Sequence, residues 1–369
     1  MDSRIRDHAD VIVDHSTDVQ AGDRVVVSAP PAAEDLAVAV YERLAEEGAT
    51  PVMLAGGQKL YGEDRASRAF LRTVDTDDLA EPEHLTALYE ETDVAIRIRA
   101  PDNATEQSDV DEETNAAYQR AVKPTREILL STRWCLTQYP TAGAAQLAGM
   151  STEAYEEFVW NAVNKDWETQ REHQEQMVER LDAADEVRIV SGDETDLTMS
   201  VAGMKTLNDY GEHNLPGGEV FTAPVPDSVE GEVLFDKPLY HNGREVEDAF
   251  LRFEDGEVVE HSAARNEETL TEILETDAGA RRLGELGIGM NRDIDRFTYN
   301  MLFDEKMGDT VHLAVGMAYA ECVPEDREPN DSATHVDMIV DMSEDSRIEL
   351  DGDVVQRNGT FEFEEGFEG

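Results

Sequence analysis

The sequence predicts a two-domain protein, in which an α/β domain with a parallel sheet is followed by an α+β domain with a mostly antiparallel sheet. The chain has 369 residues, 40% of them hydrophobic, which suggests two domains at about 150 residues each. Short apolar runs alternate with amphipathic helical segments in the first half, whereas strands and turns follow one another from residue 186. We therefore expect domains at residues 1–185 and 186–369.

The first half repeats a strand-helix alternation. The helical segments are residues 5–15, 33–47, 83–91 and 112–122. The apolar runs expected to form strands are residues 25–27, 51–54, 94–98 and 134–136. Strands joined by helices run parallel and are covered on both faces. A long helix is then expected from the N-cap Ser151 to about Leu181, as a bridge to the second domain.

The second half is dominated by strand patterns. The strand-like segments are residues 187–192, 196–203, 218–225, 231–240 and 247–263, with one helix at about 267–275. Turn residues between consecutive strands favour antiparallel pairing. The last nine residues, FEFEEGFEG, predict an acidic and frayed end of the chain.

The charge balance excludes several classes of partner. The chain carries 83 Asp plus Glu against 31 Lys plus Arg, a formal charge of −52. Such a field repels DNA, RNA and anionic membranes, because these partners require clustered Lys and Arg. Only six of the basic residues are Lys, and the acids are spread over the whole chain without a block. We therefore expect a halophilic, haloarchaeal-type protein from a salt-accumulating cytosol.

The sequence also predicts a soluble, cytoplasmic protein. The stretch MDSRIRDHADVIVDH has acids where a secretory signal needs apolar residues, and no run of about 18 apolar residues is present. The two cysteines, Cys135 and Cys322, are too few for a disulfide framework and suit a reducing compartment. The sequence contains no motif of a serine-hydrolase elbow, a phosphate-binding P-loop, a His-Glu-x-x-His zinc helix or a Cys-x-x-Cys pair.

Candidate metal ligands gather in the second domain. In residues 334–342, alternation places His335 and Asp337 on one face of a strand and apolar residues on the other. An imidazole and a carboxylate together can form the edge of a metal site. An ordinary exposed strand face is the competing interpretation.

His312 is expected to be buried, because it lies in the apolar run 311–318. A buried neutral imidazole needs either a hydrogen-bond partner or a metal. His312 and Tyr319 share a face if the segment is a helix. If the segment is a strand, a bulge near Gly316 is needed to bring both inward.

Two glutamates complete the candidate set. Glu219 follows two glycines and starts an apolar strand, and glycines allow close approach of the backbone. Glu285 lies between Gly284 and Gly287 among apolar neighbours. Among 83 acidic residues any single glutamate is expected to be surface charge. Glu219 and Glu285 become candidate ligands only when they are considered together with the histidines.

Four segments occur in order along the second domain, LPGGEVFTAP, DAGARRLGELGIGMN, FDEKMGDTVHLAVGMAY and THVDM. Together they resemble the signature segments of the thermophilic aminopeptidase T (M29) family of two-metal exopeptidases. VQAGDRVVVSAP, EGATPV and the turn GDETDL extend the resemblance over nearly the whole chain. The resemblance implies a homodimeric metalloaminopeptidase that hydrolyses the N-terminal residue from peptides with a free N-terminus.

The resemblance also implies a ligand set of six residues, which are Glu219, Glu285, His312, Tyr319, His335 and Asp337. It further makes Glu219, Glu285 and Tyr319 candidates for a catalytic role. Three carboxylates, two imidazoles and a phenol can hold two divalent ions about 3.5–4 Å apart. Zinc, cobalt and manganese all accept such ligands, so the choice of metal stays open. The identity of the bridging glutamate stays open as well.

Two other functions compete with this one. His312, His335 and Asp337 alone would suffice for the two-His, one-carboxylate triad of a mononuclear non-haem iron ring-cleaving dioxygenase. That enzyme has no need for the two glutamates and the tyrosine, so their presence favours peptide hydrolysis. A salt-adapted protein that binds hydrated cations is the third possibility. It predicts ligand-type residues scattered at random, whereas these residues fall in matched segments.

Overall fold

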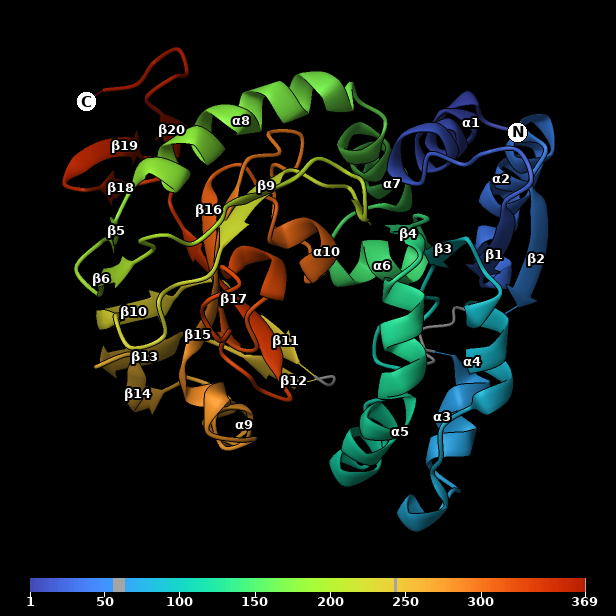
Figure 1. Ribbon diagram of the computed structural model, residues 1–369, viewed down its shortest axis with the longest axis horizontal. Helices are drawn as coiled ribbons and strands as arrows, with labels where there is room; N and C mark the ends of the chain where they lie inside the picture. The colour runs from blue at the N-terminus through green and yellow to red at the C-terminus, as the bar shows by residue number, and fades with distance from the viewer. Residues whose placement is uncertain (56–63, 242–243, 369) are drawn as a thin grey trace. The chain divides into compact units, whose positions relative to one another are not determined.

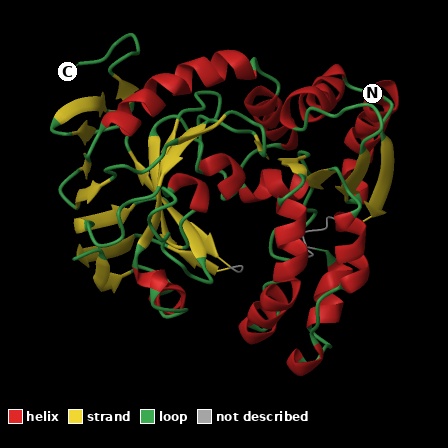
Figure 2. Ribbon diagram, viewed as in Figure 1, coloured by secondary structure: helices red, strands yellow, loops and turns green. Residues whose placement is uncertain are grey.

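The computed structural model describes residues 1–55, 64–241 and 244–368 (Figure 1). Contacts divide the chain into two compact units. The first unit is Met1–Lys165 with Gly211–Gly217, and the second is Asp166–Tyr210 with Gly218–Gly369. The predicted order of an α/β part followed by an α+β part is confirmed (Figure 2). The domain boundary expected from the sequence, between residues 185 and 186, stays a prediction.

The first unit is built on a parallel sheet with the strand order β2-β1-β3-β4-β8. Its strands are β1 (Arg24–Ala29), β2 (Thr50–Ala55), β3 (Val94–Arg99), β4 (Arg133–Gln138) and β8 (Asn214–Leu215). Its helices are α1 (Ser3–Asp10), α2 (Glu34–Glu47), α3 (Arg65–Leu71), α4 (Glu83–Glu90), α5 (Glu112–Leu130), α6 (Ala142–Leu147) and α7 (Thr152–Val163). A π-helical turn, Val11–Ser16, continues α1.

Apolar side chains hold helices against this sheet. Val26 of β1 and Ala95 of β3 pack with Tyr89 of α4 and with Val122 and Leu129 of α5. Helices α1 and α2 pack against one another, and α2 contacts β1 and β2. Parallel strands that helices cover on both faces have nearly continuous apolar sequences. The sequences of β1 and β3 show this pattern.

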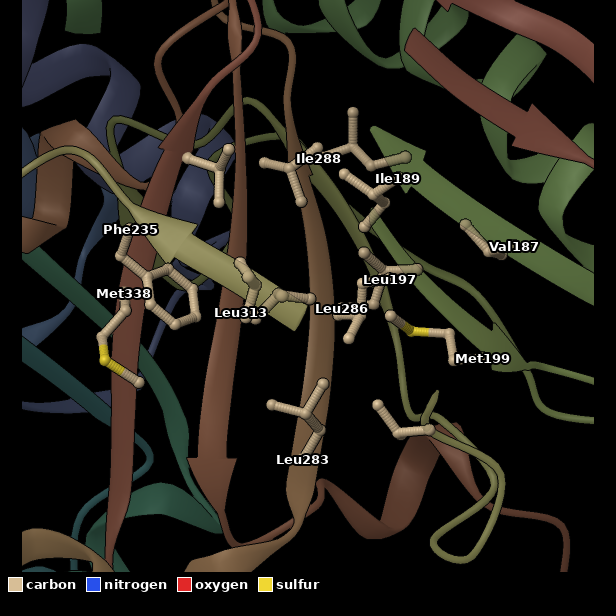
Figure 3. Packing of buried hydrophobic residues seen from close by; sticks show 14 of the residues in the cluster. Val187, Ile189, Leu197, Met199, Phe235, Leu283, Leu286, Ile288, Leu313 and Met338 are labelled. Atoms are coloured by element: carbon tan, nitrogen blue, oxygen red, sulfur yellow. The ribbon is translucent and has the colours of Figure 1, made fainter. Parts of the chain in front are cut away.

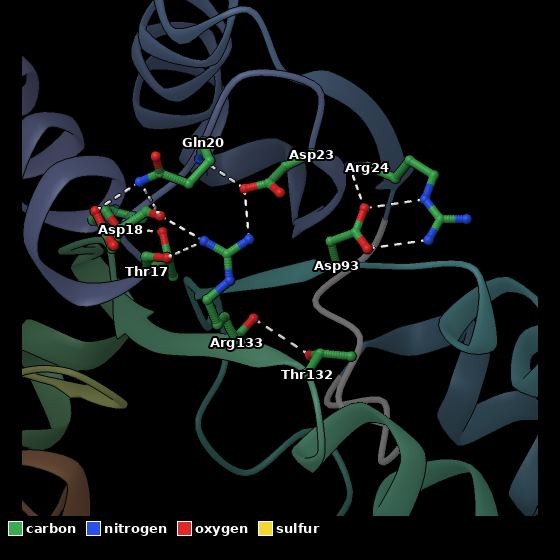
Figure 4. A network of polar contacts seen from close by, with 9 residues as sticks. Thr17, Asp18, Gln20, Asp23, Arg24, Asp93, Thr132 and Arg133 are labelled. Carbon is green, nitrogen blue, oxygen red and sulfur yellow. Dashed lines mark hydrogen bonds and ion pairs between the residues drawn. The ribbon is translucent and has the colours of Figure 1, made fainter.

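An arginine-carboxylate network joins the starting ends of three parallel strands (Figure 4). Arg24 Nε lies 3.0 Å from Asp93 Oδ2, and Arg133 Nη2 lies 2.6 Å from Asp23 Oδ2. Arg133 also donates to the carbonyl oxygen of Thr17 over 3.2 Å. Exposed pairs of this kind contribute about 0–1 kcal/mol each. The network connects the chain before β1 with the first residues of β1 and β4 and the residue preceding β3.

Among its described residues, the second unit contains two larger antiparallel sheets and one two-stranded antiparallel pair. The eight-stranded sheet has the order β14-β13-β10-β6-β5-β18-β19-β20, and the five-stranded sheet has the order β17-β16-β15-β9-β7. The first sheet consists of β5 (Glu186–Ser191), β6 (Thr195–Ser200), β10 (Glu230–Phe235), β13 (Ala249–Glu254), β14 (Glu257–Ser262), β18 (Ser346–Leu350), β19 (Asp353–Arg357) and β20 (Thr360–Phe361).

The five-stranded sheet carries the candidate ligands. It consists of β7 (Leu207–Asp209), β9 (Glu219–Thr222), β15 (Leu283–Gly289), β16 (Thr310–Gly316) and β17 (His335–Asp341). The two-stranded pair is β11 (Leu239–His241) with β12 (Arg244–Val246). The helices of this unit are α8 (Trp167–Ala183), α9 (Glu267–Leu274) and α10 (Met301–Asp304).

The core of the second unit lies between its two larger sheets (Figure 3). Leu286 and Ile288 of β15 and Leu313 of β16 belong to the same buried cluster as Ile189 of β5 and Leu197 of β6. Because strand side chains alternate, the residues between these apolar positions point away from this core. The five-stranded sheet therefore has a second face for polar residues.

The predicted long helix at residues 151–181 is two helices. α7 ends at Val163, and Asn164 has non-helical angles, φ −93° and ψ 70°. Asp166 then caps α8, since its Oδ1 accepts from the backbone N–H groups of Glu168 and Thr169 over 3.2 Å each. Helical periodicity continues through both pieces, so the sequence pattern did not reveal the break, although Asp166 is a favourable N-cap residue.

The first residues of the expected frayed end are packed instead. The rings of Phe361 and Phe363 stack with centroids 5.3 Å apart. Glu364 accepts a 2.9 Å hydrogen bond from the backbone N–H of Phe361 and a 2.6 Å bond from Arg292 Nη2. The aromatic residues between the acids provide the apolar surface that ties this segment down.

Cys135 and Cys322 are both buried, and neither forms a disulfide. Within the three described ranges, no helix has the length and apolar character needed to cross a membrane.

Candidate metal centre

The segment around His312 forms strand β16. The segment is a strand, with Val311, Leu313 and Val315 in the core, so His312 points to the opposite face. The expected burial of His312 is confirmed, because only 1% of its surface is exposed. The strand ends at Gly316, whose φ of +106° turns the chain before Tyr319.

A bulge in β15 sets the direction of Glu285. Leu283 pairs with Val315 and Glu285 pairs with Ala314, so the register shifts at Gly284. The extra residue reverses the alternation. Leu283 and Leu286 therefore both enter the core, and Glu285 points to the same face as His312.

Five of the six candidate ligands converge on this face. His312 Nε2 lies 3.1 Å from Glu219 Oε2 and 3.2 Å from Glu285 Oε1. His335 Nε2 lies 3.4 Å from Glu285 Oε2 and 3.5 Å from Asp337 Oδ1. They form two groups of three, within each of which the ligand atoms lie within 4.8 Å of one another. Glu285 belongs to both groups, with one carboxylate oxygen toward each histidine.

Small residues make room for these side chains. The cross-strand neighbour of His312 is Gly287, and Ala314 lies between Glu285 and Asp337 in the pairing of three strands. A Cβ atom at Gly287 would lie 1.9 Å from His312 Nε2. Close packing of this kind leaves no space for any other residue at position 287.

Tyr319 lies beyond the strand and contacts the cluster through its ring. Its centroid is 5.1 Å from that of His335 and 5.7 Å from that of Phe221. The residue is 40% exposed overall. Desolvation of its hydroxyl and the nearby charges of Glu285 and Asp337 nevertheless raise the pKa of Tyr319 well above its ordinary value.

The orientation of His335 is set by the backbone. Its Nδ1 lies 2.8 Å from the carbonyl oxygen of Met317, which can only accept a hydrogen bond. Nδ1 therefore carries a hydrogen, and Nε2 is the nitrogen that faces Glu285 and Asp337. Metal-binding histidines are commonly oriented in this way by a second hydrogen bond.

Mutual attraction shifts the pKa values of the cluster. Burial alone would lower the pKa of His335 and raise that of Asp337. Their ion pair outweighs burial and moves the pKa of His335 to about 10 and that of Asp337 to about 2. Glu285 has a raised pKa, because burial there outweighs the attraction of His312 and His335.

The polar atoms of the cluster fit a bound cation. Glu219 Oε2 and Glu285 Oε2 are buried without any hydrogen-bond partner. Buried acceptors in folded proteins are nearly always paired with a donor, a water or an ion. Carboxylate oxygens and imidazole nitrogens suit divalent ions such as Zn²⁺, Co²⁺ and Mn²⁺. The sequence-derived ligands and this geometry therefore agree with a divalent metal as the missing partner.

Sequence reasoning missed the charged residues beneath Glu219. Lys306 is fully buried, and its Nζ lies 3.0 Å from Glu219 Oε1 and 3.9 Å from Asp209 Oδ2. It also forms a short ion pair with Glu305. Burial would lower the pKa of Lys306, but the three carboxylates raise it. Lys306 is one of only six lysines in the chain and lies in a segment flanked by apolar residues. These two features were the sequence evidence that could have indicated a buried lysine.

Helix α8 fixes the strands that carry this part of the site (Figure 1). Gln174 is fully buried, and its Nε2 donates to the carbonyl oxygens of Asp209 and Glu219 over 2.9 and 2.8 Å. Gln170 Nε2 donates to Gln174 Oε1 over 2.8 Å and to the carbonyl oxygen of Met290 over 3.1 Å. The two glutamines connect the helix to β7, β9 and the end of β15.

The convergent carboxylates and imidazoles form a candidate site for divalent metal ions on the face of a β-sheet. The chain belongs to the thermophilic metalloprotease (M29) family, which matches residues 1–361. It is therefore a metal-dependent peptide hydrolase, a member of a family whose curated relatives are aminopeptidases.

Relatives and solved structures extend over nearly the whole chain. The chain is 28% identical to aminopeptidase AmpS of Bacillus subtilis, over 98% of both proteins. It is also 28% identical to aminopeptidase T of Thermus aquaticus, over 93% of both. Wild-type AmpT from Thermus thermophilus has a similar structure, with a TM-score of 0.84, 25% identity and coverage of 98% of this chain and 99% of that one.

A 2,5-dihydroxypyridine dioxygenase from Pseudomonas putida KT2440 shares the fold. The TM-score is 0.61 at 13% identity, over 98% of this chain and 97% of the other. A shared fold does not establish a shared activity. The family match favours peptide hydrolysis over the ring-cleaving dioxygenase that the sequence left as an alternative.

Proposed function

We propose that this protein is an aminopeptidase that hydrolyses the N-terminal residue from peptides at a co-catalytic site for two divalent ions. Glu219, Glu285 and His312 would hold one ion, and Glu285, His335 and Asp337 would hold the other. The observation that carries this proposal is the position of Glu285, which offers one oxygen to each group of ligands. A single-ion site would not need this shared carboxylate.

When bound, the ions would polarise the scissile carbonyl and lower the pKa of a bound water toward neutrality. The chain's own residues prepare the surroundings. The hydrogen bond from His335 Nδ1 to the carbonyl oxygen of Met317 orients the ring so that Nε2 is the nitrogen available to an ion. The raised pKa of Tyr319 keeps its hydroxyl protonated at neutral pH, so that it can donate a hydrogen bond to a developing oxyanion.

Cleavage from the amino end follows from the charge of the site. Three ligand carboxylates, Glu219, Glu285 and Asp337, concentrate negative charge at the cluster. A peptide with a free α-ammonium is attracted to such a site. We propose Glu219, Glu285 and Tyr319 as the residues that take part in catalysis, besides the ligand roles that the family resemblance implies for them.

The proposal includes the setting in which the enzyme works. Two buried thiols outside any disulfide suit a reducing cytoplasm. The charge of −52 suits a salt-rich one. We further propose a homodimer, by analogy with the family that the sequence resembles. The metal could be Zn²⁺, Co²⁺ or Mn²⁺.

Replacement of Glu285 tests the proposal. Glu285→Gln removes the charge shared by both groups while keeping the size of the side chain. The expected result is a loss of at least about a hundredfold in kcat on an aminoacyl anilide, because one preorganised charge is lost at the reacting centre. Bound metal should fall from two ions per chain toward one. Both quantities are measured in molar salt with Zn²⁺, Co²⁺ or Mn²⁺ supplied.

Glu257→Gln is the matched control, because Glu257 lies on β14 and contacts Arg282 rather than the ligand cluster. This variant should retain two ions and wild-type activity. The proposal is wrong if the wild type binds a single iron without peptidase activity, or if Glu285→Gln cleaves at the wild-type rate.

A further inference from the structure

A fully buried lysine lies directly behind the candidate ligands and has no role in the reaction described above. Lys306 has no exposed surface, whereas lysine is almost never fully buried in proteins unless it is paired. It follows α10 and Glu305, in a segment that ends at β16. Of the candidate ligands, Glu219 is the one that its ammonium contacts.

Stability alone does not account for such a residue. Taking an ammonium and its carboxylate partners out of water costs several kcal/mol, and apolar residues of similar volume often give equal or greater stability. The partners of Lys306 are Glu305, Asp209 and Glu219. Of these, Glu219 is also a member of the ligand cluster.

The two oxygens of Glu219 have different surroundings. Oε1 lies 3.0 Å from Lys306 Nζ. Oε2 lies 3.1 Å from His312 Nε2 and has no hydrogen-bond partner. The backbone of Glu219 is held as well, since Gln174 donates to its carbonyl oxygen over 2.8 Å. The ammonium therefore occupies one carboxylate oxygen and leaves the other directed at the cluster.

We propose that Lys306 is a positioning residue that keeps Glu219 as a one-oxygen metal ligand. The inference rests on the metal site proposed above. Its positive charge blocks Oε1 from a cation and reduces the negative charge that Glu219 presents. One coordination position of the ion is thereby kept open for water or substrate, at the expense of metal affinity.

Lys306→Met tests this inference, because methionine has similar length without the charge. Removal of the ammonium frees Oε1, so Glu219 is expected to bind Co²⁺ through both oxygens. The visible absorption of the Co²⁺-loaded protein should then weaken, as it does when coordination number increases. Co²⁺ should bind about tenfold or more tightly, because a nearby positive charge is gone. The kcat should fall about tenfold or more, with KM little changed.

Lys237→Met is the matched control. Lys237 Nζ lies 2.7 Å from Asp341 Oδ2, at the far end of the strand that carries His335 and Asp337. This variant also removes a lysine from an ion pair with β17, but away from the ligands. Its Co²⁺ spectrum, its affinity for Co²⁺ and its kcat should match those of the wild type.

A purely structural role for Lys306 predicts the opposite result. A disordered site would bind Co²⁺ more weakly, and this outcome would overturn the inference, as would an unchanged spectrum. If Lys306→Met does not fold, Lys306→Met with Glu305→Gln removes a buried carboxylate together with the cation, and the same spectral change is expected. A crystal structure of the Zn²⁺-loaded wild type needs no variant. It should show Glu219 bound through Oε2 alone, and a two-oxygen Glu219 there would contradict the inference.

The wild type separates this inference from the proposed function. A wild type that binds no metal at the cluster and cleaves no peptide would refute the proposed function itself. A wild type that is active with two ions, accompanied by a Lys306→Met variant that is indistinguishable from it, would refute only the role of Lys306.

Discussion

At the scale of single residues, the absence of a side chain at Gly287 is as important as any ligand. The imidazole of His312 lies over the backbone of Gly287, its cross-strand neighbour. A methyl group there would overlap Nε2, the nitrogen that faces Glu219 and Glu285. The position of an imidazole is thus set by a residue that contributes no chemistry.

Gly287→Ala is therefore expected to lower metal affinity and kcat by at least about tenfold, since His312 must rotate away. Isothermal titration with Zn²⁺ measures the first effect. Gly149→Ala is the control, because Gly149 has a left-handed φ of +64° but open space around its Cα. It should lose stability without losing metal. Equal metal affinity in Gly287→Ala and the wild type would contradict the packing argument.

A second residue-scale prediction concerns Glu364. Burial alone would raise the pKa of Glu364, but contacts with His173 and Arg292 lower it to about 2, from an ordinary 4.5. The folded-state pKa is depressed, so this contribution to stability is full above about pH 4.5 and is lost as pH falls through about 2. Glu364→Gln should destabilise the protein by about 1–2 kcal/mol at pH 7.

The stability difference between Glu364→Gln and the wild type should shrink as pH falls from 4.5 toward 2. Thermal melts at several pH values in constant salt measure it. Glu365→Gln, at the exposed neighbouring position, should melt like the wild type at every pH. A difference that stays constant with pH would mean that the charge of Glu364 is not what holds the end of the chain.

At the scale of elements, α8 acts on the site through two glutamines rather than through apolar packing alone. Gln174 reaches the backbone of both β7 and β9. Met177 and Leu181 of the same helix lie in the core. The helix therefore joins the buried core to the strand from which Glu219 projects.

Gln174→Met should destabilise the protein by about 2–4 kcal/mol, because the carbonyl oxygens of Asp209 and Glu219 each lose a buried donor. Metal affinity should fall as well, since the backbone of Glu219 is released. Chemical denaturation and metal titration measure the two effects. Gln176→Met tests the same substitution on a half-buried face of α8, and it should change neither quantity. Loss of stability without loss of metal affinity would separate the helix from the site.

At the scale of the whole molecule, the charge of −52 opposes folding. The screening length is about 10 Å at 0.1 M salt and about 3 Å at 1 M. The melting temperature should therefore climb steeply as KCl increases from about 0.1 to 2 M. A flat or falling curve, measured by calorimetry, would show that the protein is not adapted to salt. Sucrose in place of KCl is the control, since it stabilises compact states without screening charge.

Local patterns in the sequence predict much of this structure. Alternation in residues 334–342 places His335 and Asp337 on one face, and β17 has Val336, Met338 and Val340 in the core as expected. Strand-helix alternation predicts the parallel sheet of the first unit. These features depend on the period of a strand or helix, which neighbouring residues determine by themselves.

Other features depend on contacts between residues that are distant in the chain, and only the tertiary structure determines these features. The bulge at Gly284 aims Glu285 at His312 and His335, and its existence depends on the pairing of β15 with β16. The burial of Lys306 depends on β7 and β9, which belong to segments about a hundred residues earlier. The break between α7 and α8 occurs where Asp166 caps a new helix instead of continuing the first one. Side-chain types and spacing name the candidate ligands, but distances between them are set by strand register, because register depends on contacts that no local pattern contains.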